Sequence, residues 1–419
     1  MHVTAQHVAT AVAGLILLRW AAQMLLEHLN RRHTARLQTG ALPDALRERV
    51  EATTLARSVE YTLARSRLHQ IEDTLDALVL LVVLFSGVLP WSHQRFGAWL
   101  GAAPWATAAW VLAVGLALSA VALPLRWIEQ FRLEARFGFN TATQRTWWLD
   151  RLKGLLLVIV LGMPLLALVF QIVARAGPIW WLWAWLTWVG FELLVMLVAP
   201  VVILPWFNRF TPLPEGSLRE RLMRLAARTG FRARNIQVMD GSRRSRHSNA
   251  FFTGFGRFRK IVLFDTLIEQ LDETELEAVL AHEIAHYQRG HLVKMVSVSV
   301  LLSGAGFYAA AWLARQDWFA PAFGFAPGET APALLVCALL AGVIGFWFAP
   351  LHRLWLRRCE YEADAFAARV LETAQPLVSA LRKLTGNNLG NLSPHPLYGV
   401  FYHSHPTLLE REAAVTQIK

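Results

Sequence analysis

Seven apolar blocks constrain the fold of this chain more than any other feature of its 419-residue sequence. A helix that crosses a lipid bilayer needs about 20 mostly apolar residues. The blocks that meet this requirement cover approximately residues 8–26, 75–91, 98–123, 154–174, 179–204, 293–313 and 331–351. Backbone polar groups inside a membrane must be bonded within the protein, which favours helices. The sequence therefore predicts a mainly α-helical integral membrane protein with seven transmembrane helices.

The charges between these blocks predict how the chain is oriented. Arginines are concentrated in residues 30–70 and 126–153, whereas the connections 92–97 and 316–330 contain one basic residue between them, Arg95. Because cytosolic loops carry an excess of Lys and Arg, we expect the N-terminus outside and residues 207–292 and the C-terminal tail in the cytosol. The same rule explains the net charge of +11, so we expect a lipid bilayer and no nucleic acid as partner.

Two ionisable residues, Arg19 and Glu192, lie within the apolar blocks. Such groups usually face the interior of a helix bundle or a water-filled cavity. The alternatives are an arginine that extends to the membrane surface and a glutamate that makes a structural hydrogen bond. The sequence leaves both interpretations open. The first block is not expected to be a cleaved signal peptide, because no Lys or Arg precedes it.

Residues 207–292 form the main polar segment of the chain. Pro212 and Pro214 end the fifth block, and residues 216–229 have the pattern of an amphipathic helix. Three short strands are predicted at residues 236–239, 248–253 and 260–264, with a turn at residues 254–256 between the last two. We therefore expect a small β-sheet that leads into the next helix.

That next helix is predicted for residues 273–289. Asp272 is a good N-cap residue, and Glu275 stands where a capping box requires an acidic partner. Gly290 is suited to end the helix, because glycine readily adopts the left-handed conformation found after helix C-termini.

His282 and His286 are four residues apart in this predicted helix, so they share a face. Two neutral imidazoles one turn apart can hold two corners of a tetrahedral Zn²⁺ site. Glu283 would reach a metal-bound water without binding the metal and would accept a proton from that water. The alternative is an amphipathic helix with two surface histidines, so a third ligand decides between the two interpretations.

The segment after the seventh block offers that ligand. Glu360 and Asp364 are one helical turn apart, which suits a carboxylate ligand and a second carboxylate that fixes the tautomer of an imidazole. Glu362 would point elsewhere, and an acidic patch on a solvated helix is the alternative. Two histidines and one glutamate with an open fourth position are typical of a catalytic zinc site rather than a closed structural one.

Further segments extend the pattern over nearly the whole chain. They are residues 134–140 (Glu-Ala-Arg-Phe-Gly-Phe-Asn), 207–214 (Phe-Asn-Arg-Phe-Thr-Pro-Leu-Pro), 246–254 (Arg-His-Ser-Asn-Ala-Phe-Phe-Thr-Gly), 360–364 (Glu-Tyr-Glu-Ala-Asp) and 404–407 (Ser-His-Pro-Thr), followed by Glu410 and Arg411. In this order and spacing the sequence resembles the type I CAAX prenyl endopeptidases, multi-spanning zinc metalloproteases that process isoprenylated C-terminal peptides. Phe251 stands where that family commonly has tyrosine.

The resemblance implies roles for individual residues around the metal. His282, His286 and Glu360 would bind zinc, and Glu283 would be the general base. Asp364 would bind the far nitrogen of a zinc-bound histidine.

The resemblance also implies contacts with substrate. Asn249, with Ala250 beside it, would contact the substrate backbone from an edge strand. His405 would help to stabilise the oxyanion, and Arg357 would steady the site or pair with substrate. On spacing alone Asn249 would be a turn residue and His405 a structural histidine. His291 is expected to be structural, because a fourth protein ligand would close the site.

The fold implied by the resemblance is a seven-helix transmembrane barrel around a water-filled chamber, with a cytosolic zinc domain that contains the small β-sheet. We expect residues 1–206 to form a membrane domain of five spans and residues 207–292 the first part of the catalytic domain. Residues 293–351 would add two spans, and residues 352–419 would complete the catalytic domain with the third zinc ligand.

We therefore expect a membrane-embedded endopeptidase with one zinc ion per chain. Its substrate would be a peptide or protein with a prenylated C-terminus, or, in a host without prenylation, a broader set of membrane proteins cleaved in quality control. A non-catalytic scaffold or a transporter is the alternative from another class. A composition rich in Ala, Arg and Trp favours a bacterial inner membrane, and the endoplasmic reticulum would be expected in a eukaryote. The oligomeric state stays open.

Overall fold

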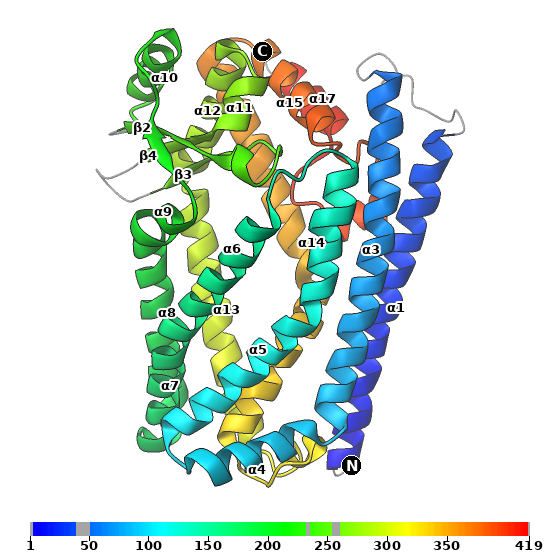
Figure 1. Cartoon of the computed structure of the whole chain (residues 1–419), viewed down its shortest axis with the longest axis vertical. Helices are drawn as coiled ribbons and strands as arrows, with labels where there is room; N and C mark the ends of the chain where they lie inside the picture. Colours follow the sequence, from blue (N-terminus) through cyan, green and yellow to red (C-terminus); the bar gives the residue numbers. More distant parts are fainter. Residues whose placement is uncertain (1–2, 39–50, 232–234, 254–259, 418–419) are drawn as a thin grey trace.

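Long helices dominate the computed structural model, which describes residues 3–38, 51–231, 235–253 and 260–417. These helices run along the long axis of the molecule, and the N-terminus lies at one end of it (Figure 1). A small sheet and several shorter helices gather at the other end. The predicted combination of membrane helices and a polar domain with a small sheet is confirmed.

Six described helical segments are long and apolar enough to cross a membrane, and a bent pair of helices makes up to seven. In chain order the elements are α1 (Ala5–Gln38), the bent pair α3 (Ala52–Phe85) and α4 (Val88–Leu100), α5 (Pro104–Ile128) with η1 (Glu129–Glu134), α6 (Gln144–Leu157) with η2 (Val158–Gly162) and α7 (Met163–Arg175), η3 (Gly177–Ile179) with α8 (Trp180–Val198), η4 (Ala199–Ile203) and α9 (Leu204–Phe207), α13 (His291–Ala314) and α14 (Thr330–Leu371). Each apolar block of the sequence overlaps one of these segments.

The second predicted span, residues 75–91, crosses the bend between α3 and α4. The two helices meet at 58°, and Gly87 between them has a φ of +82°, a conformation that glycine adopts without steric cost. α5 begins only at Pro104, so residues 98–100, expected in the third span, belong to α4. Hydrophobicity is continuous across both places and therefore did not reveal the bend.

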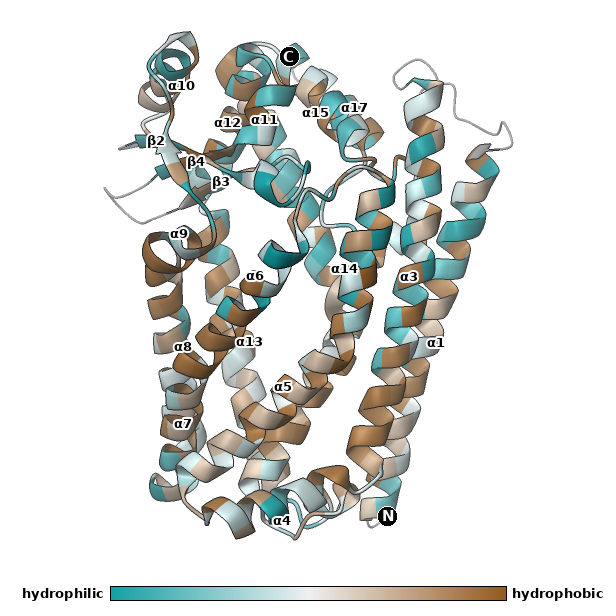
Figure 2. Cartoon of the chain, viewed as in Figure 1, coloured by the Kyte–Doolittle hydropathy of each residue, from teal (hydrophilic) through white to brown (hydrophobic). Residues whose placement is uncertain are grey.

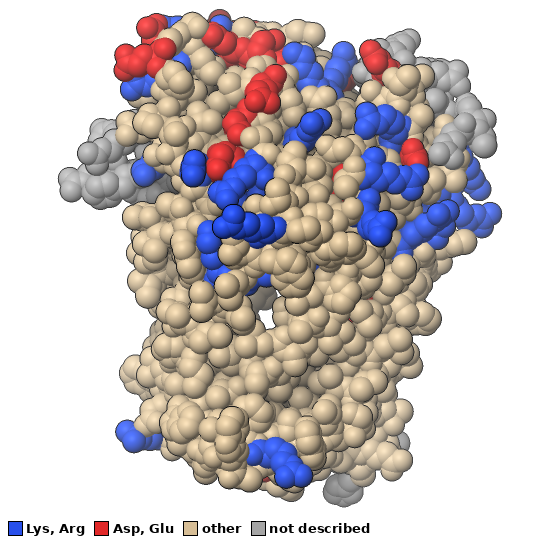
Figure 3. All heavy atoms as spheres, viewed as in Figure 1, with Lys and Arg blue, Asp and Glu red and all other residues tan. Residues whose placement is uncertain are grey.

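An apolar belt surrounds the part of the molecule away from the sheet. Hydrophobic residues dominate the spans there (Figure 2), and the same part of the visible face is nearly free of charged side chains (Figure 3). Lys and Arg gather above the belt, at the end that holds the sheet, and the N-terminus lies at the opposite end (Figures 1 and 3). This is the arrangement that the predicted orientation requires.

The membrane helices form a closed ring. Neighbouring pairs are α1 and α3, α3 and α5, α5 and α7, α7 and α8, α8 and α13, α13 and α14, and finally α14 and α1. At most 22% of the most apolar stretch of any span is buried, so the spans do not pack into a solid bundle. The space-filling view also shows an opening in the wall (Figure 3). The expected barrel-like arrangement is therefore present.

Arg19 and Glu192 have different surroundings. The Nε atom of Arg19 is buried and has no hydrogen-bond partner among the described residues, and the side chain reaches toward Gly342 of α14. Arg19 of α1 thus lies against α14, where these two neighbouring helices of the ring meet. Glu192 on α8 accepts a hydrogen bond from the Ser299 hydroxyl on α13, at 3.3 Å, which is the structural role considered for it.

The small sheet has four strands in the order β1-β2-β4-β3. They are β1 (Phe210–Pro212), β2 (Asn235–Met239), β3 (Ala250–Thr253) and β4 (Lys260–Phe264). Three were predicted, and β1 was missed because it is short and ends in proline. β3 pairs antiparallel with β4 and forms one edge of the sheet. It begins two residues later than predicted, and the predicted turn at 254–256 lies outside the described residues.

The sheet packs with α10 (Ser217–Arg228) and α12 (Glu273–Gln288) in one hydrophobic core. Leu222 and Leu225 of α10, Ile261 of β4 and Leu276 and Leu280 of α12 are almost completely buried in it. Shorter elements complete the fold: η5 (Gly241–Arg243), α11 (Asp265–Gln270), η7 (Ala320–Phe323), α15 (Gln375–Asn387), α16 (Pro396–Tyr402) and α17 (Leu408–Thr416).

α14 is a single helix of 42 residues. Its first half is the last span, and its second half carries Glu360 and Asp364 and packs against α12. The expected boundary between residues 351 and 352 therefore falls inside this helix. Pro350 lies within it but does not end it. The wall of the ring and the third candidate ligand are thus one continuous element.

Candidate metal centre

α12 positions the two histidines. The Asp272 side chain accepts hydrogen bonds from the backbone N–H groups of Thr274 and Glu275, and the Glu275 carboxylate accepts one from the backbone of Asp272. This is the predicted capping box. His282 and His286 project from the same face of the helix, with their Nε2 atoms 3.2 Å apart.

α14 brings Glu360 to this pair of imidazoles. Its carboxylate oxygens lie 3.5 Å from Nε2 of His282 and 3.4 Å from Nε2 of His286. One candidate ligand atom from each of the three residues lies within 4.8 Å of the other two. The buried Oε2 of Glu360 has no hydrogen-bond partner among the described residues. Arg411 Nη2 lies 3.7 Å from this oxygen, beyond hydrogen-bond distance. A buried carboxylate oxygen without a hydrogen bond beside two imidazoles fits a divalent cation.

A second carboxylate orients His282. The Oδ1 atom of Asp364, which is fully buried, lies 2.8 Å from Nδ1 of His282. Arg411 of α17 donates two hydrogen bonds to the same carboxylate, at 2.7 and 2.6 Å. Because the His282 Nδ1–H is held by Asp364, its Nε2 is free to face a cation. In the sequence, Arg411 is recognisable only as part of the motif that follows residues 404–407, and nothing local links it to Asp364.

His286 has an outer partner of its own. Its Nδ1 lies 2.9 Å from Nδ1 of His291, which is buried at the start of α13. The Nε2 of His291 lies 3.2 Å from Glu362, which also pairs with Arg358. Glu362 therefore points away from the candidate ligands, as expected, yet supports one of them through His291. Sequence reasoning treated His291 as structural and missed this link.

Two other candidate residues lie beside the ligands. The Nε2 of His405 is 3.5 Å from Oε1 of Glu360, and its Nδ1 is 2.9 Å from the Ser404 hydroxyl. Its side chain is 62% exposed, so it is accessible to a bound molecule. Glu283 follows His282 on α12 and is half-buried. Burial raises the pKa of its carboxyl group.

The residues expected to contact substrate have less defined surroundings. Asn249 precedes β3, its carbonyl accepts a hydrogen bond from the backbone of Phe264, and its side chain is exposed. Ala250 is the first residue of β3, the edge strand. Arg357 is half-buried on α14, one turn before Glu360, and no hydrogen bond or ion pair joins it to these three described residues.

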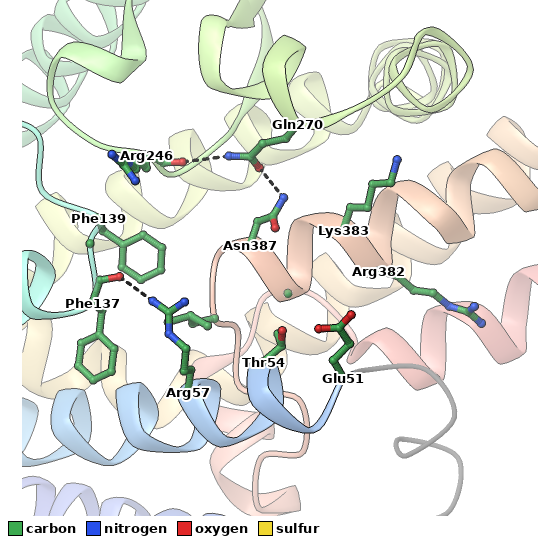
Figure 4. A pocket seen from close by; sticks show the side chains of 13 residues that line it. Glu51, Thr54, Arg57, Phe137, Phe139, Arg246, Gln270, Arg382, Lys383 and Asn387 are labelled. Carbon is green, nitrogen blue, oxygen red and sulfur yellow. Dashed lines mark hydrogen bonds between the residues drawn. The ribbon is translucent and has the colours of Figure 1, made fainter.

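A separate cavity of about 660 Å³ lies between α3, α15 and residues 137–139. Gln270 bridges its rim, donating to the Arg246 carbonyl and accepting from Asn387 (Figure 4). No candidate metal ligand lines this cavity. Two of its basic side chains are already paired, Arg382 with Glu412 and Lys383 with Glu275. The cavity is therefore distinct from the metal centre.

Comparisons with known proteins cover both parts of the chain. A family model described as CAAX prenyl protease N-terminal, five membrane helices, matches residues 30–209. A second, described as Peptidase family M48, matches residues 212–419. Together they include the membrane helices and all the candidate site residues.

Individual relatives match over nearly their whole length. A CAAX prenyl protease 1 homolog of Oryza sativa is 34% identical over 393 residues, covering 92% of each protein. CAAX prenyl protease 1 of Saccharomyces cerevisiae is 33% identical over 419 residues, covering 93% of this chain and 92% of the relative. The crystal structure of S. mikatae Ste24p superimposes with a TM-score of 0.91 at 29% identity, covering 97% of this chain and 98% of that one.

Proposed function

This chain belongs to the CAAX prenyl protease 1 family of M48 metallopeptidases, and we propose on that basis that it is a zinc endopeptidase acting on prenylated C-terminal peptides. Family membership makes it a multi-pass membrane metalloendopeptidase with peptide or protein substrates. Family membership therefore favours an enzyme over the two alternatives, a non-catalytic scaffold and a transporter. The ion, the roles of single residues and the prenyl group belong to the proposal.

The observation that carries the proposal is the meeting of three ligand atoms from His282, His286 and Glu360 within 4.8 Å. Two imidazoles and one carboxylate are a donor set typical of catalytic zinc sites. Zinc held there would polarise the scissile carbonyl and lower the pKa of a bound water. The residues around the zinc would transfer protons and position the reacting groups.

Glu283 would act as the general base and then as the general acid. It would accept a proton from the attacking water as the new C–O bond forms, and would return a proton to the amine as the C–N bond breaks. The raised pKa that burial gives this carboxyl suits a group that must hold a proton between two steps.

Other residues would position the reacting groups. Asp364, held by Arg411, would fix the tautomer of His282. His405, beside Glu360, would donate a hydrogen bond to the developing oxyanion. The free edge of β3, beginning at Asn249 and Ala250, would pair with the backbone of an extended peptide.

The prenylated substrate is proposed from the relatives, whose names are CAAX prenyl protease 1 or its homolog. These relatives are eukaryotic, and they give no support to the preference for a bacterial inner membrane. We propose that the metal centre faces the cytosol, because Lys and Arg gather at its end of the molecule.

Replacement of Glu283 tests the mechanism. In Glu283→Gln we expect peptide cleavage to fall by roughly 10²- to 10⁴-fold, with near-stoichiometric zinc retained by elemental analysis. Glu273→Gln, a partly exposed position in the first turn of the same helix, is the matched control and should cleave normally. Undiminished turnover in Glu283→Gln would exclude this residue as the base.

A pair of peptides tests the substrate. One peptide is offered with and without a farnesyl group on its cysteine, and we expect faster cleavage of the farnesylated form. Equal rates for the two peptides would contradict prenyl recognition and favour the broader quality-control role.

A further inference from the structure

Two arginines share a helix face with the third metal ligand. Arg353 and Arg357 lie seven and three residues before Glu360 on α14, spacings that place all three on one face of a helix. The same face carries Asp364, which is completely buried against His282. The row of guanidinium groups therefore starts at the metal centre and extends toward the ring of membrane helices.

These arginines lack counter-charges. The Nε atoms of both are buried without a hydrogen-bond partner, and the structure gives neither side chain an ion pair within the part of the chain that it describes. The neighbouring Arg358 is different, since it is 81% exposed and pairs with Glu362. Partly buried positive charges without partners are costly, so this face of α14 is suited to an anion.

The surrounding residues show that the arginines border the metal centre. Burial lowers the pKa of His403, and the charges of Arg357 and Arg353 lower it further. His403 is two residues before His405, which lies 3.5 Å from Glu360. Both arginines and the candidate ligands therefore face the same region.

We propose that Arg353 and Arg357 bind the terminal carboxylate of the substrate peptide. This inference rests on the proposed function. If cleavage follows the prenylated cysteine of a C-terminal Cys-a-a-X sequence, three residues separate the scissile carbonyl from the free carboxylate. Guanidinium groups bind carboxylates through two parallel hydrogen bonds, which supplies both strength and orientation.

The distances along the helix agree with a peptide of that length. With a rise of about 1.5 Å per residue, Arg357 and Arg353 lie about 4.5 and 10.5 Å from Glu360 along the axis of α14. Three extended residues span about 10 Å. A carboxylate three residues beyond the scissile carbonyl thus falls within reach of these side chains.

Peptide binding tests the inference separately from catalysis. The Glu283→Gln protein, loaded with zinc, is titrated with a fluorescent farnesylated peptide ending in a free acid and with the same peptide ending in an amide. We expect the acid to bind on the order of 10- to 100-fold more tightly, as charged hydrogen bonds of about 1.5–3 kcal/mol require. Adding Arg353→Gln or Arg357→Gln should reduce this ratio by weakening acid binding alone. Arg369→Gln, an exposed change near the end of α14, is the matched control and should preserve the ratio.

Two results would overturn the inference. Equal affinity for acid and amide in the background protein would show that the carboxylate is not recognised. An equal loss for both peptides in the arginine variants would show that these side chains support the fold or hold a lipid phosphate instead. Zinc content and melting temperature identify misfolded variants, and Arg357→Lys, which keeps the charge, should retain part of the ratio. Turnover by the wild-type protein decides the proposed function independently of these affinities.

Discussion

At the scale of single residues, the two candidate imidazole ligands are held from outside in different ways. Nδ1 of His282 meets a carboxylate that is itself held by Arg411, whereas Nδ1 of His286 meets the ring of His291. Outer partners of this kind orient a ligand and raise its basicity. The His291 and Glu362 pair should therefore affect metal binding although neither residue touches the metal.

Replacement of His291 checks this expectation. In His291→Ala we expect zinc affinity to fall by roughly 10- to 100-fold, because His286 loses the group that fixes its tautomer. Equilibrium competition with a chelator measures it. Glu362→Gln should act in the same direction but less strongly, and Arg289→Ala, an exposed change at the end of α12, should have no effect. Unchanged zinc affinity with a lowered melting temperature would assign His291 to packing alone.

The site residues that could be predicted from the sequence lie close together in it, whereas the missed pairs lie far apart. His282, Glu283 and His286 are recognisable from their spacing within one helix. Arg411 and Asp364 are 47 residues apart, and His291 and Glu362 are 71 apart. Such pairs are formed by the packing of α13 and α17 against α14, which a single sequence does not specify.

At the scale of elements, the cap of α12 is the feature most directly tied to the ligands. The side chain of Asp272 accepts two backbone N–H groups, and its pKa is lowered by the hydrogen bond from the Thr274 hydroxyl and by the backbone bonds. A lowered pKa in the folded state stabilises the protein above the unfolded pKa. That stabilisation is lost as the pH falls through the folded value.

Two substitutions at Asp272 test the cap. Asp272→Ala should cost about 1 kcal/mol near pH 7, measured by thermal unfolding in detergent. The difference from the wild type should shrink as the pH falls below about 4, where the carboxylate becomes protonated. Asp272→Asn keeps a capping oxygen without the charge, so its stability relative to Asp272→Ala should not depend on pH. If the stability difference between the wild type and Asp272→Ala were as large at low pH as at pH 7, the charge of Asp272 would not contribute to the cap.

Elements were predictable where one segment carried its own pattern. α10, α12, β2 and β4 were found close to their observed bounds, because periodicity, caps and strand residues are local. The bend at Gly87 and the continuity of α14 through Pro350 were not predicted. Proline commonly ends helices, but in membrane helices neighbouring groups can satisfy the freed carbonyl.

At the scale of the whole molecule, the ring of helices was expected only through a resemblance. A block such as α8, with tryptophan and leucine on every side, has no polar face that marks the interior. Long-range packing determines which pairs of helices meet, including the contact between α14 and α1 that closes the ring. The orientation stays a prediction, made from the excess of Lys and Arg in particular loops.

Cysteine labelling tests that orientation. In a protein with Cys337 and Cys359 changed to serine, Asp317→Cys should react with a membrane-impermeant maleimide from the non-cytosolic side. Glu269→Cys, on α11 at the end of the molecule that holds the sheet (Figure 1), should react only after the membrane is permeabilised. Both positions are exposed in the structure. The opposite pattern of labelling would invert the proposed topology.

Because α14 is a single helix of 42 residues, a small tilt of its membrane part would displace Glu360 in the metal centre. Glu360 lies 30 residues from the outer end of this rod, or about 45 Å, so a tilt of 2° about that end would displace it by about 1.6 Å. Displacements of about 1 Å can slow an enzyme by about 10²-fold. A mismatch with the bilayer thickness, which a helix can accommodate by tilting, would then alter the catalytic rate, and a micelle and a native membrane would give different turnover for the same polypeptide.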